Sequence, residues 1–322
     1  MIVRHGLGEL AGLLDQLGVS RPFVLASRRW SDLVLPVDPV GTWRQVPSSR
    51  LAEIAARTAG ADVLVPVGGG SSIDLAKAVS ALTRLPVVSI PTTYSGAEWT
   101  DFYGVRDPDR TLRGGGAGAI LAGIVYDPQL TLELPRAEAV GTALNALAHC
   151  AEALYVRGRN AEGDRRALAG AGLISQSLPR VVEAPASLDL RAELLLGAMH
   201  AGQALAAAGL GLGHAMAQAL GGRYGLSHGA LNAICLPLAL RFNAPVVPAE
   251  LERFGAAMAA EDPIARVQWL ARLGGFGRLR DLGVPAEELD LVAADTAARP
   301  GARANPRRAS PGEIAAMLRG VW

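Results

Sequence analysis

Three of the five histidines, all after residue 135, stand at spacings that suggest a site. His149 follows Asn145 by four residues, and His214 and His228 stand in the two apolar helical segments further along. Residues four apart share one helix face, so Asn145 and His149 point the same way. Clustered imidazoles can hold a divalent metal ion, or can bind and protonate a substrate that carries a carboxylate. Both chemistries stay open here, beside a purely structural role for each histidine.

A second group of residues predicts a phosphate site. In residues 63–80 an apolar strand pattern runs directly into three glycines, and a helical pattern then opens at Ser71. Bare backbone N–H groups at a helix N-terminus favour an anion. Ser71 and Asp74 have the spacing of a capping box, with Ser71 as the N-cap. The expected cradle consists of Gly68, Gly69, Gly70, Ser71 and Ser72.

Lys77 follows one helical turn after this cradle. It is the only lysine in the chain, because every other basic side chain is arginine. A compact ammonium at this position suits a contact with phosphate. A pair with Asp74 at i,i+3 explains the lysine equally well.

Hydroxyl side chains follow the predicted strand 85–90. Thr92, Thr93 and Ser95 stand where open α/β sheets bind ligands, and their hydroxyls suit amide or phosphate oxygens.

The expected end of an earlier strand, residues 21–26, carries no acidic residue. It runs into Ser27, Arg28 and Arg29 instead. If a dinucleotide binds, this favours tolerance of a 2′-phosphate. Two solvated arginines on a surface loop are the alternative.

Strand and helix patterns alternate up to Pro135, which predicts a Rossmann-like parallel-sheet domain over residues 1–135. Residues 30–50 hold three prolines and no helical run, so we expect a shortened unit with a strand-like piece at 32–37 and a loop. Two further strands, 102–105 and 124–126, flank an expected glycine-rich loop or lid.

After Pro135 the pattern predicts an all-helical domain over residues 136–322, which carries the histidines. The expected helices span residues 136–155, 161–182, 188–207, 212–220, 229–242, 248–258, 263–273, 285–298 and 311–321.

Composition narrows the possible partners and the compartment. A net charge of +1 gives no case for nucleic acid or an anionic membrane. Cys150 and Cys235 stand in apolar helical patterns, which predicts buried thiols of a reducing compartment rather than a disulfide. No apolar run reaches membrane-spanning length, and polar residues interrupt the N-terminal segment. We therefore expect a soluble cytoplasmic protein.

Several motifs together resemble the iron-containing alcohol dehydrogenases, which share the dehydroquinate synthase-like fold, and among them the maleylacetate reductases. The motifs are GGGSSIDLAK, IPTTYSGAEWTDFYGV, YDPQLTLELP, ALNALAHCAEALY, GLGHAMAQALGGRYGLSHG and ANPRRASPGEIAAML. The resemblance implies a nicotinamide cofactor, NADH or NADPH, whose pyrophosphate is held by the glycine cradle with Asp74 and Lys77. It implies that Thr92, Thr93 and Ser95 lie near the nicotinamide, with His149, His214 and His228 opposite it across a cleft.

The chain departs from the family pattern at three places. Asn145 stands where metal-dependent members carry an aspartate ligand, and a neutral amide is a poor metal ligand. Maleylacetate reductases carry the same asparagine, so the resemblance implies catalysis without metal; if a metal is present, His149, His214 and His228 are its expected ligands. Gln218 replaces a frequent histidine, and the short 30–50 segment removes part of the adenosine platform.

The resemblance implies a metal-independent NAD(P)H-dependent reductase of maleylacetate or a related small carboxylated substrate, working as a homodimer. His149, His214, His228 and Asn145 are its expected catalytic residues. Three alternatives stay open: a diverged member that catalyses a non-redox acid/base step, a non-catalytic partner subunit, and a metal-dependent alcohol dehydrogenase.

Overall fold

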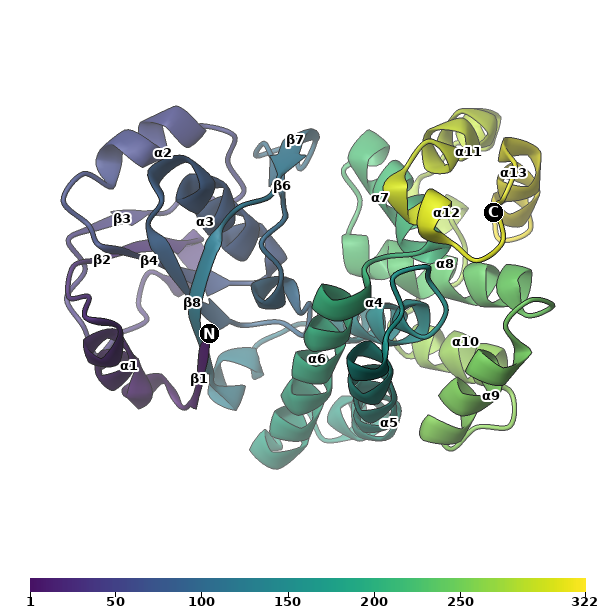
Figure 1. The fold of residues 1–322 in the computed structure, drawn as a ribbon, viewed down its shortest axis with the longest axis horizontal. Helices are drawn as coiled ribbons and strands as arrows, with labels where there is room; N and C mark the ends of the chain where they lie inside the picture. The colour runs from purple at the N-terminus through teal and green to yellow at the C-terminus, as the bar shows by residue number, and fades with distance from the viewer. The chain divides into compact units, whose positions relative to one another are not determined.

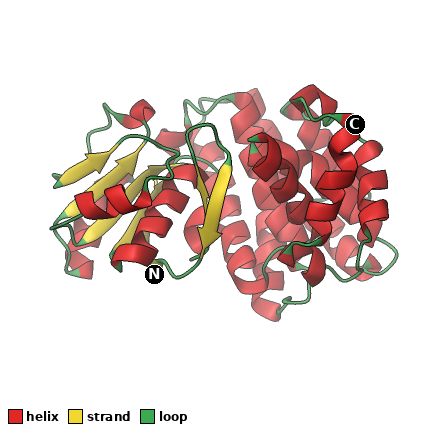
Figure 2. Cartoon of the chain, turned by 90° about the horizontal axis from the view of Figure 1, so that it is seen from above, coloured by secondary structure: helices red, strands yellow, loops and turns green.

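The computed structural model describes every residue from Met1 to Trp322, and the chain forms two units. The first contains Met1–Thr93 and Ala97–Glu133, and the second contains Tyr94–Gly96 and Leu134–Trp322. All strands belong to the first unit, and the long helices from α4 onward belong to the second (Figures 1 and 2). The predicted fold class, a parallel-sheet α/β part followed by a helical part, is confirmed.

Six strands form a parallel sheet in the order β1-β8-β5-β4-β2-β3. They are β1 (Ile2–His5), β2 (Pro22–Ala26), β3 (Gly41–Trp43), β4 (Val63–Gly68), β5 (Pro86–Pro91) and β8 (Ile120–Tyr126). Strands β2 and β4 are buried along their whole length, which is typical of parallel strands covered on both faces.

Helices cover both faces of this sheet. One apolar cluster joins α1 (Leu10–Leu17) to one face, and another joins α2 (Leu51–Arg57) and α3 (Gly70–Thr83) to the other. Successive residues of a strand point to opposite faces, so Val65 of β4 enters the first cluster and Leu64 enters the second. This two-sided burial fixes the edge of the sheet where β4 passes into α3.

The segment after β2 differs from the prediction. Residues 32–37, expected to be strand-like, form no strand, so that prediction is wrong. Leu33 and Leu35 instead pack over the apolar cluster on the α1 side of the sheet, and the third parallel strand is β3, a few residues later. The predicted loss of a crossover helix is confirmed, because only one turn of 3-10 helix, Arg28–Trp30, lies between β2 and β3.

The expected glycine-rich lid is also wrong, because it contains a strand. Strand β7 (Leu112–Gly116) pairs antiparallel with β6 (Tyr103–Arg106). A Cβ atom added to Gly115 would lie 2.8 Å from the Tyr103 carbonyl oxygen. The glycines therefore permit the close approach of two backbones. The edge strand β1 was not predicted from the sequence.

The second unit consists of ten α-helices. They are α4 (Arg136–Ala153), α5 (Ala161–Glu183), α6 (Leu188–Ala208), α7 (Leu212–Tyr224), α8 (His228–Asn243), α9 (Pro248–Ala257), α10 (Pro263–Leu273), α11 (Leu289–Ala297), α12 (Pro300–Ala304) and α13 (Pro311–Arg319). The predicted helices agree with these within a few residues, and only α12 was missed. No single helix is long and apolar enough to cross a membrane.

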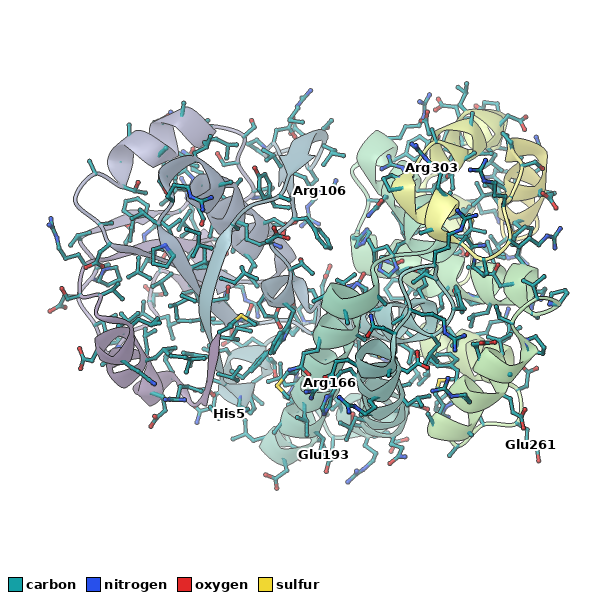
Figure 3. All side chains as sticks on the ribbon, viewed as in Figure 1. His5, Arg106, Arg166, Glu193, Glu261 and Arg303 are labelled. Atoms are coloured by element: carbon teal, nitrogen blue, oxygen red, sulfur yellow. The ribbon has the colours of Figure 1, made fainter.

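Polar side chains that cap the first N–H groups explain where two of these helices begin. Asp262 accepts hydrogen bonds from the backbone N–H groups of Ile264 and Ala265 at the start of α10. Ser310 and Glu313 form a capping box at the start of α13. Glu261, beside the α10 cap, lies at the exposed surface of the helical unit (Figure 3).

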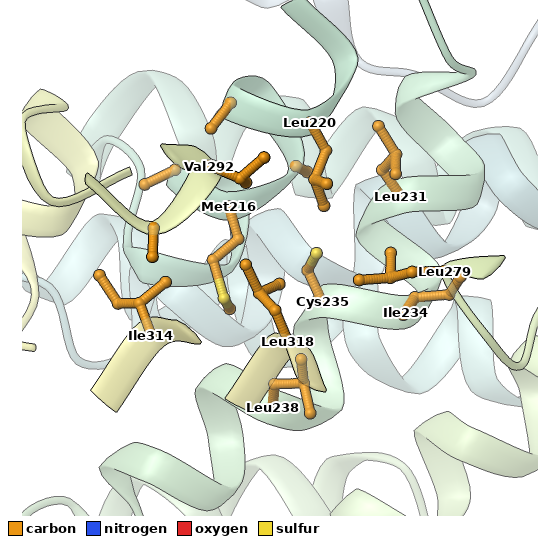
Figure 4. Packing of buried hydrophobic residues seen from close by; sticks show 14 of the residues in the cluster. Met216, Leu220, Leu231, Ile234, Cys235, Leu238, Leu279, Val292, Ile314 and Leu318 are labelled. Atoms are coloured by element: carbon orange, nitrogen blue, oxygen red, sulfur yellow. The ribbon is translucent and has the colours of Figure 1, made fainter. Parts of the chain in front are cut away.

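A large apolar cluster holds α7 and α8 in place (Figure 4). It joins residues of α7 and α8 to side chains of α11 and α13, and the members labelled in the figure include Met216, Leu220, Leu231, Ile234, Val292, Ile314 and Leu318. Protein interiors are close-packed and leave side chains little room to move. The cluster therefore holds in place the two backbone segments that carry His214 and His228.

Candidate active site

The glycine turn that ends β4 depends on the absence of side chains. Gly68 has a φ of +147°, a conformation that favours glycine, and a Cβ added there would lie 2.4 Å from the Ser72 Oγ. A Cβ on Gly69 would lie 2.8 Å from the Thr93 Cγ2. The turn therefore brings the backbone of Gly69 and Gly70 close to the threonine loop with no side chain between them.

The first turn of α3 has no side-chain cap, so the predicted capping box is wrong. The N-cap is Gly69 rather than Ser71, and no side chain bonds to the first N–H groups. Asp74 is turned to other partners, because its Oδ2 accepts from the Gly104 N–H at 3.2 Å and its Oδ1 lies 2.8 Å from the Lys77 Nζ. A helix start without a cap leaves its N–H groups available to an anion.

Lys77 is almost fully buried, with 1% of its side chain exposed. Its ammonium donates to the carbonyl oxygens of Ala97 at 2.8 Å and Phe102 at 2.7 Å, and it pairs with Asp74. An ammonium has three donors, and these partners use all three. The pair with Asp74 is therefore present, and a contact between Lys77 and the cofactor remains only a prediction.

The threonine loop after β5 lies beside the glycine turn. The Thr92 N–H donates to the Gly68 carbonyl at 3.0 Å, which ties the two strand ends together. The Thr93 Oγ1 is buried and has no partner, and the same holds for the Ser95 Oγ. Buried hydroxyls are normally satisfied, so an orphaned oxygen indicates a place for a ligand or water. Thr93 belongs to the first unit, whereas Ser95 belongs to the second.

A small pocket lies beside the strands that are expected to hold the adenosine half of a dinucleotide. It has a volume of about 80 Å³ and is lined by Val67 just before the glycine turn, by Trp30 and Leu35, and by Arg44. Arg29, which follows β2, forms an exposed ion pair with Glu133, and its Nη2 lies 3.8 Å from the Glu133 Oε2.

Three helices of the second unit bring the histidines together. His149 lies on α4, His214 on α7 and His228 at the start of α8. The rings of His149 and His214 stack with their centroids 4.6 Å apart, and the ring of His228 lies 5.7 Å from that of His214. A Cβ on Gly229 would lie 2.5 Å from the backbone of Gly141 in α4, so this glycine lets α8 approach α4 closely.

A buried glutamate that the sequence analysis did not single out lies beneath the cluster. The Glu152 carboxylate is fully buried on α4, and its Oε2 lies 2.7 Å from the His214 Nδ1. Glu152 follows His149 by three residues, within the quoted motif ALNALAHCAEALY. In the sequence, the signal for a buried glutamate was a single carboxylate within an otherwise apolar helical stretch.

Burial and neighbouring rings set the protonation of His149. Desolvation is the largest cause that lowers the pKa of His149 well below its usual value, followed by the nearby His214 and His228. Its Nδ1 is buried without a partner. His149 is therefore a neutral imidazole at neutral pH.

Asn145 has partners at both ends of its amide. Its Nδ2 donates to the Ser95 carbonyl at 3.0 Å, and its Oδ1 accepts from the Asn232 Nδ2 at 2.8 Å. The amide therefore holds the backbone of the hydroxyl loop, and the catalytic role expected for Asn145 has no direct support from these contacts.

The comparisons with known proteins identify an NAD(P)H-dependent oxidoreductase and name its family. Residues 139–322 match the model of the C-terminal part of the Fe-containing alcohol dehydrogenase family, and residues 44–117 match that of iron-containing alcohol dehydrogenase. The chain belongs to the iron-containing alcohol dehydrogenase family, and within that family it is maleylacetate reductase-like.

Relatives of nearly full length support this placement. The chain is 32% identical to the maleylacetate reductase of Pseudomonas knackmussii, covering 98% of this chain and 93% of that protein. It is 36% identical to the maleylacetate reductase of Burkholderia cepacia, covering 90% and 87% respectively. The crystal structure of maleylacetate reductase from Rhizobium sp. superimposes with a TM-score of 0.89 at 30% identity, over 100% of this chain and 95% of that one.

The cofactor and the metal that the family implies fit this chain differently. The uncapped helix start, the side-chain-free turn and the orphaned Thr93 Oγ1 fit the diphosphate of a dinucleotide. An iron ion does not fit the second unit as it stands. The rings of His149 and His214 stack rather than converge, the Asn145 Oδ1 is already hydrogen-bonded, and no group of three or more His, Cys, Asp or Glu side chains is arranged to hold a metal.

Proposed function

We propose that this chain is a metal-independent NAD(P)H-dependent reductase of maleylacetate or a related small carboxylated enone. The observation that carries the proposal is the group of three imidazoles on α4, α7 and α8, two of them buried, in a chain alignable with maleylacetate reductases over almost its whole length. Imidazoles suit a carboxylate-bearing substrate because they can bind an anion and exchange a proton near neutral pH.

The first unit supplies the cofactor site in this proposal. The N–H groups at the start of α3 hold the diphosphate, and the Thr93 hydroxyl gains a partner when the cofactor is in place. When bound, NADH or NADPH supplies a hydride. The two Thr and Ser hydroxyls of the loop after β5, on Thr93 and Ser95, are proposed to lie near the nicotinamide half.

The second unit supplies acid chemistry. The hydride adds to the alkene carbon that is β to the substrate's ketone, and the electron pair of the double bond moves towards the ketone oxygen. His149, as a neutral ring, and His228 hold the substrate's oxygens and stabilise the developing enolate. An imidazole then donates a proton to the enolate carbon next to the ketone. The product is a saturated 3-oxo acid of the 3-oxoadipate type.

No step of this reaction needs a metal, because imidazole hydrogen bonds can carry the charge that develops on the ketone oxygen. We place the enzyme in the cytoplasm. The free thiols of Cys150 and Cys235 are fully buried, and burial raises the pKa of both, so neither is poised to form a disulfide.

A direct assay tests the proposal. Protein purified with a chelator is incubated with NADH or NADPH and either maleylacetate or a short aldehyde, and the loss of nicotinamide absorbance is followed. We expect oxidation with maleylacetate that persists in chelator and exceeds that with the aldehyde. No oxidation of either cofactor with maleylacetate would overturn the reductase. Activity that appears only after zinc or ferrous iron is added would overturn metal independence.

A further inference from the structure

A single buried carboxylate lies against the histidine cluster and bonds to only one of its rings. Both side chains of the pair are out of water, with Glu152 0% and His214 1% exposed, and the Oε2 to Nδ1 distance is 2.7 Å. Removing one partner from such a buried pair leaves an uncompensated charge or donor, so this geometry is strongly specified. The His214 Nε2, at the far side of the ring, is buried and has no partner.

The carboxylate is held in place by the start of α7. Its Oε2 also accepts from the Gly211 N–H at 2.6 Å, and its Oε1 accepts from the His214 N–H at 3.1 Å. Gly211 and Gly213 make room for it, because a Cβ on either would lie 3.0 Å from a carboxylate oxygen. Two backbone N–H groups already donate to Glu152, so it acts as an acceptor towards the His214 ring as well.

The other titratable side chains around Glu152 do not compete for it. Burial first, and the carboxylate second, raise the pKa values of Tyr155 and Cys235, so both stay protonated. The His149 ring stacks against the His214 ring, and its Nδ1 has no partner. The His214 ring is therefore the side chain that contacts the buried carboxylate at hydrogen-bond distance.

We propose that Glu152 is a positioning residue that keeps the proton of His214 on Nδ1 and thereby makes Nε2 the atom that protonates the substrate. This assignment rests on the function proposed above. A carboxylate bonded to Nδ1–H fixes both the ring orientation and the tautomer, and it stabilises the doubly protonated ring. In the step, Nε2–H gives its proton to the enolate carbon formed by hydride addition. The ring returns to its neutral Nδ1–H form and regains a proton from water.

Two measurements on the full-length enzyme test this. The first is nitrogen NMR of the protein labelled at its five histidines, with His214 assigned by its loss in His214→Gln. At alkaline pH we expect the His214 Nδ1 to be protonated and Nε2 to be bare. In Glu152→Gln we expect that preference to be lost, because the amide can present N–H groups to the ring. A wild-type ring protonated at Nε2 instead would overturn the proposal, whether or not the variant folds.

The second measurement is steady-state kinetics with maleylacetate in chelator. Glu152→Gln should lower kcat by about 100-fold or more, as loss of an oriented acid does, and should change the KM for NAD(P)H less than threefold. Asp262→Asn is the matched control, because Asp262 also accepts two N–H groups at a helix start but touches no histidine. It should leave kcat unchanged.

Retention of wild-type kcat in Glu152→Gln would overturn the positioning role, and so would an equal loss of kcat in the control. If the wild-type enzyme fails to reduce maleylacetate at all, the proposed function is overturned, while the NMR measurement still decides the bond between Glu152 and His214.

Discussion

The side chain of Asn145 donates a hydrogen bond to the backbone carbonyl of Ser95 at 3.0 Å. This bond explains why an asparagine stands at a position where metal-dependent relatives are expected to carry aspartate. A carboxylate has no hydrogen to donate, so an aspartate in this conformation would set two oxygens against each other. The amide therefore suits the loop that carries the Ser95 hydroxyl.

Asn145→Asp tests this relationship. We expect the free energy of unfolding to fall by about 1–3 kcal/mol, because the Ser95 carbonyl loses its donor inside the protein. Added zinc or ferrous iron should not restore the thermal midpoint. The matched control is Asn243→Asp, which breaks another buried asparagine pair, with Asn305. The control should lose stability and keep kcat, whereas a large rise in midpoint with metal for Asn145→Asp would contradict our account.

Gly69→Ala should weaken cofactor binding. The new methyl group would lie 2.8 Å from the Thr93 Cγ2, so the turn or the threonine must move away from the start of α3. We expect the Kd of NADH and NADPH to rise by about tenfold or more, which corresponds to about 1.4 kcal/mol. Fluorescence titration measures this. Gly8→Ala serves as the control, since a Cβ there meets nothing within 4 Å, and equal affinity in both variants would argue against a diphosphate at this turn.

Lys77→Met should destabilise the first unit. The substitution leaves the carbonyl oxygens of Ala97 and Phe102 and the Asp74 carboxylate without their shared donor, at a cost of about 3–5 kcal/mol. Chemical denaturation measures the loss, with the exposed Arg57→Met as a control. An unchanged stability together with weaker NADPH binding would show instead that Lys77 serves the cofactor.

Glu98→Gln should change how stability depends on pH. Desolvation is the largest cause that raises the pKa of Glu98, and Tyr126 donates to its Oε1 at 2.6 Å. Because the native carboxyl keeps its proton after the unfolded chain has lost its own, the wild type loses stability as pH rises from about 4.5 towards the native pKa. Each pKa unit between the native and the unfolded carboxyl changes the free energy of unfolding by about 1.4 kcal/mol.

The variant cannot lose that proton. Its stability relative to wild type should therefore increase with pH between pH 5 and pH 8. Thermal melts across this range measure the difference, and Glu9→Gln, at an exposed carboxylate of the same unit, should show no such trend. A constant offset across the range would contradict ionisation as the cause.

Local patterns in the sequence were enough to predict four of the six parallel strands and the long helices, and the resemblance implied that the three histidines lie together. They failed where contacts decide the structure. Glycine has low strand propensity, so residues 112–116 were expected to be a loop, although they pair with β6. The apolar alternation at 32–37 resembled a strand, but those side chains cover the sheet.

The partners of the site residues lay beyond prediction because they are distant in sequence. Glu152 meets His214 across 62 residues, and Asn145 meets Asn232 across 87. Helical periodicity shows which residues share a face, but the neighbour of that face depends on how α4, α7 and α8 pack. The close approach of Gly229 to Gly141 shows how small residues set that packing.

The tripeptide Tyr94–Gly96 has a consequence for dissecting the protein. It is counted with the helical unit although the chain on either side of it belongs to the other. Arg191 bonds to the Tyr94 hydroxyl, Thr142 accepts from the Tyr94 N–H, and a Cβ on Gly96 would touch the backbone of Gly202. A gene fragment that starts at Leu134 would thus encode a helical body lacking three of its own residues. Chimaeras between relatives should exchange this insert together with the C-terminal half.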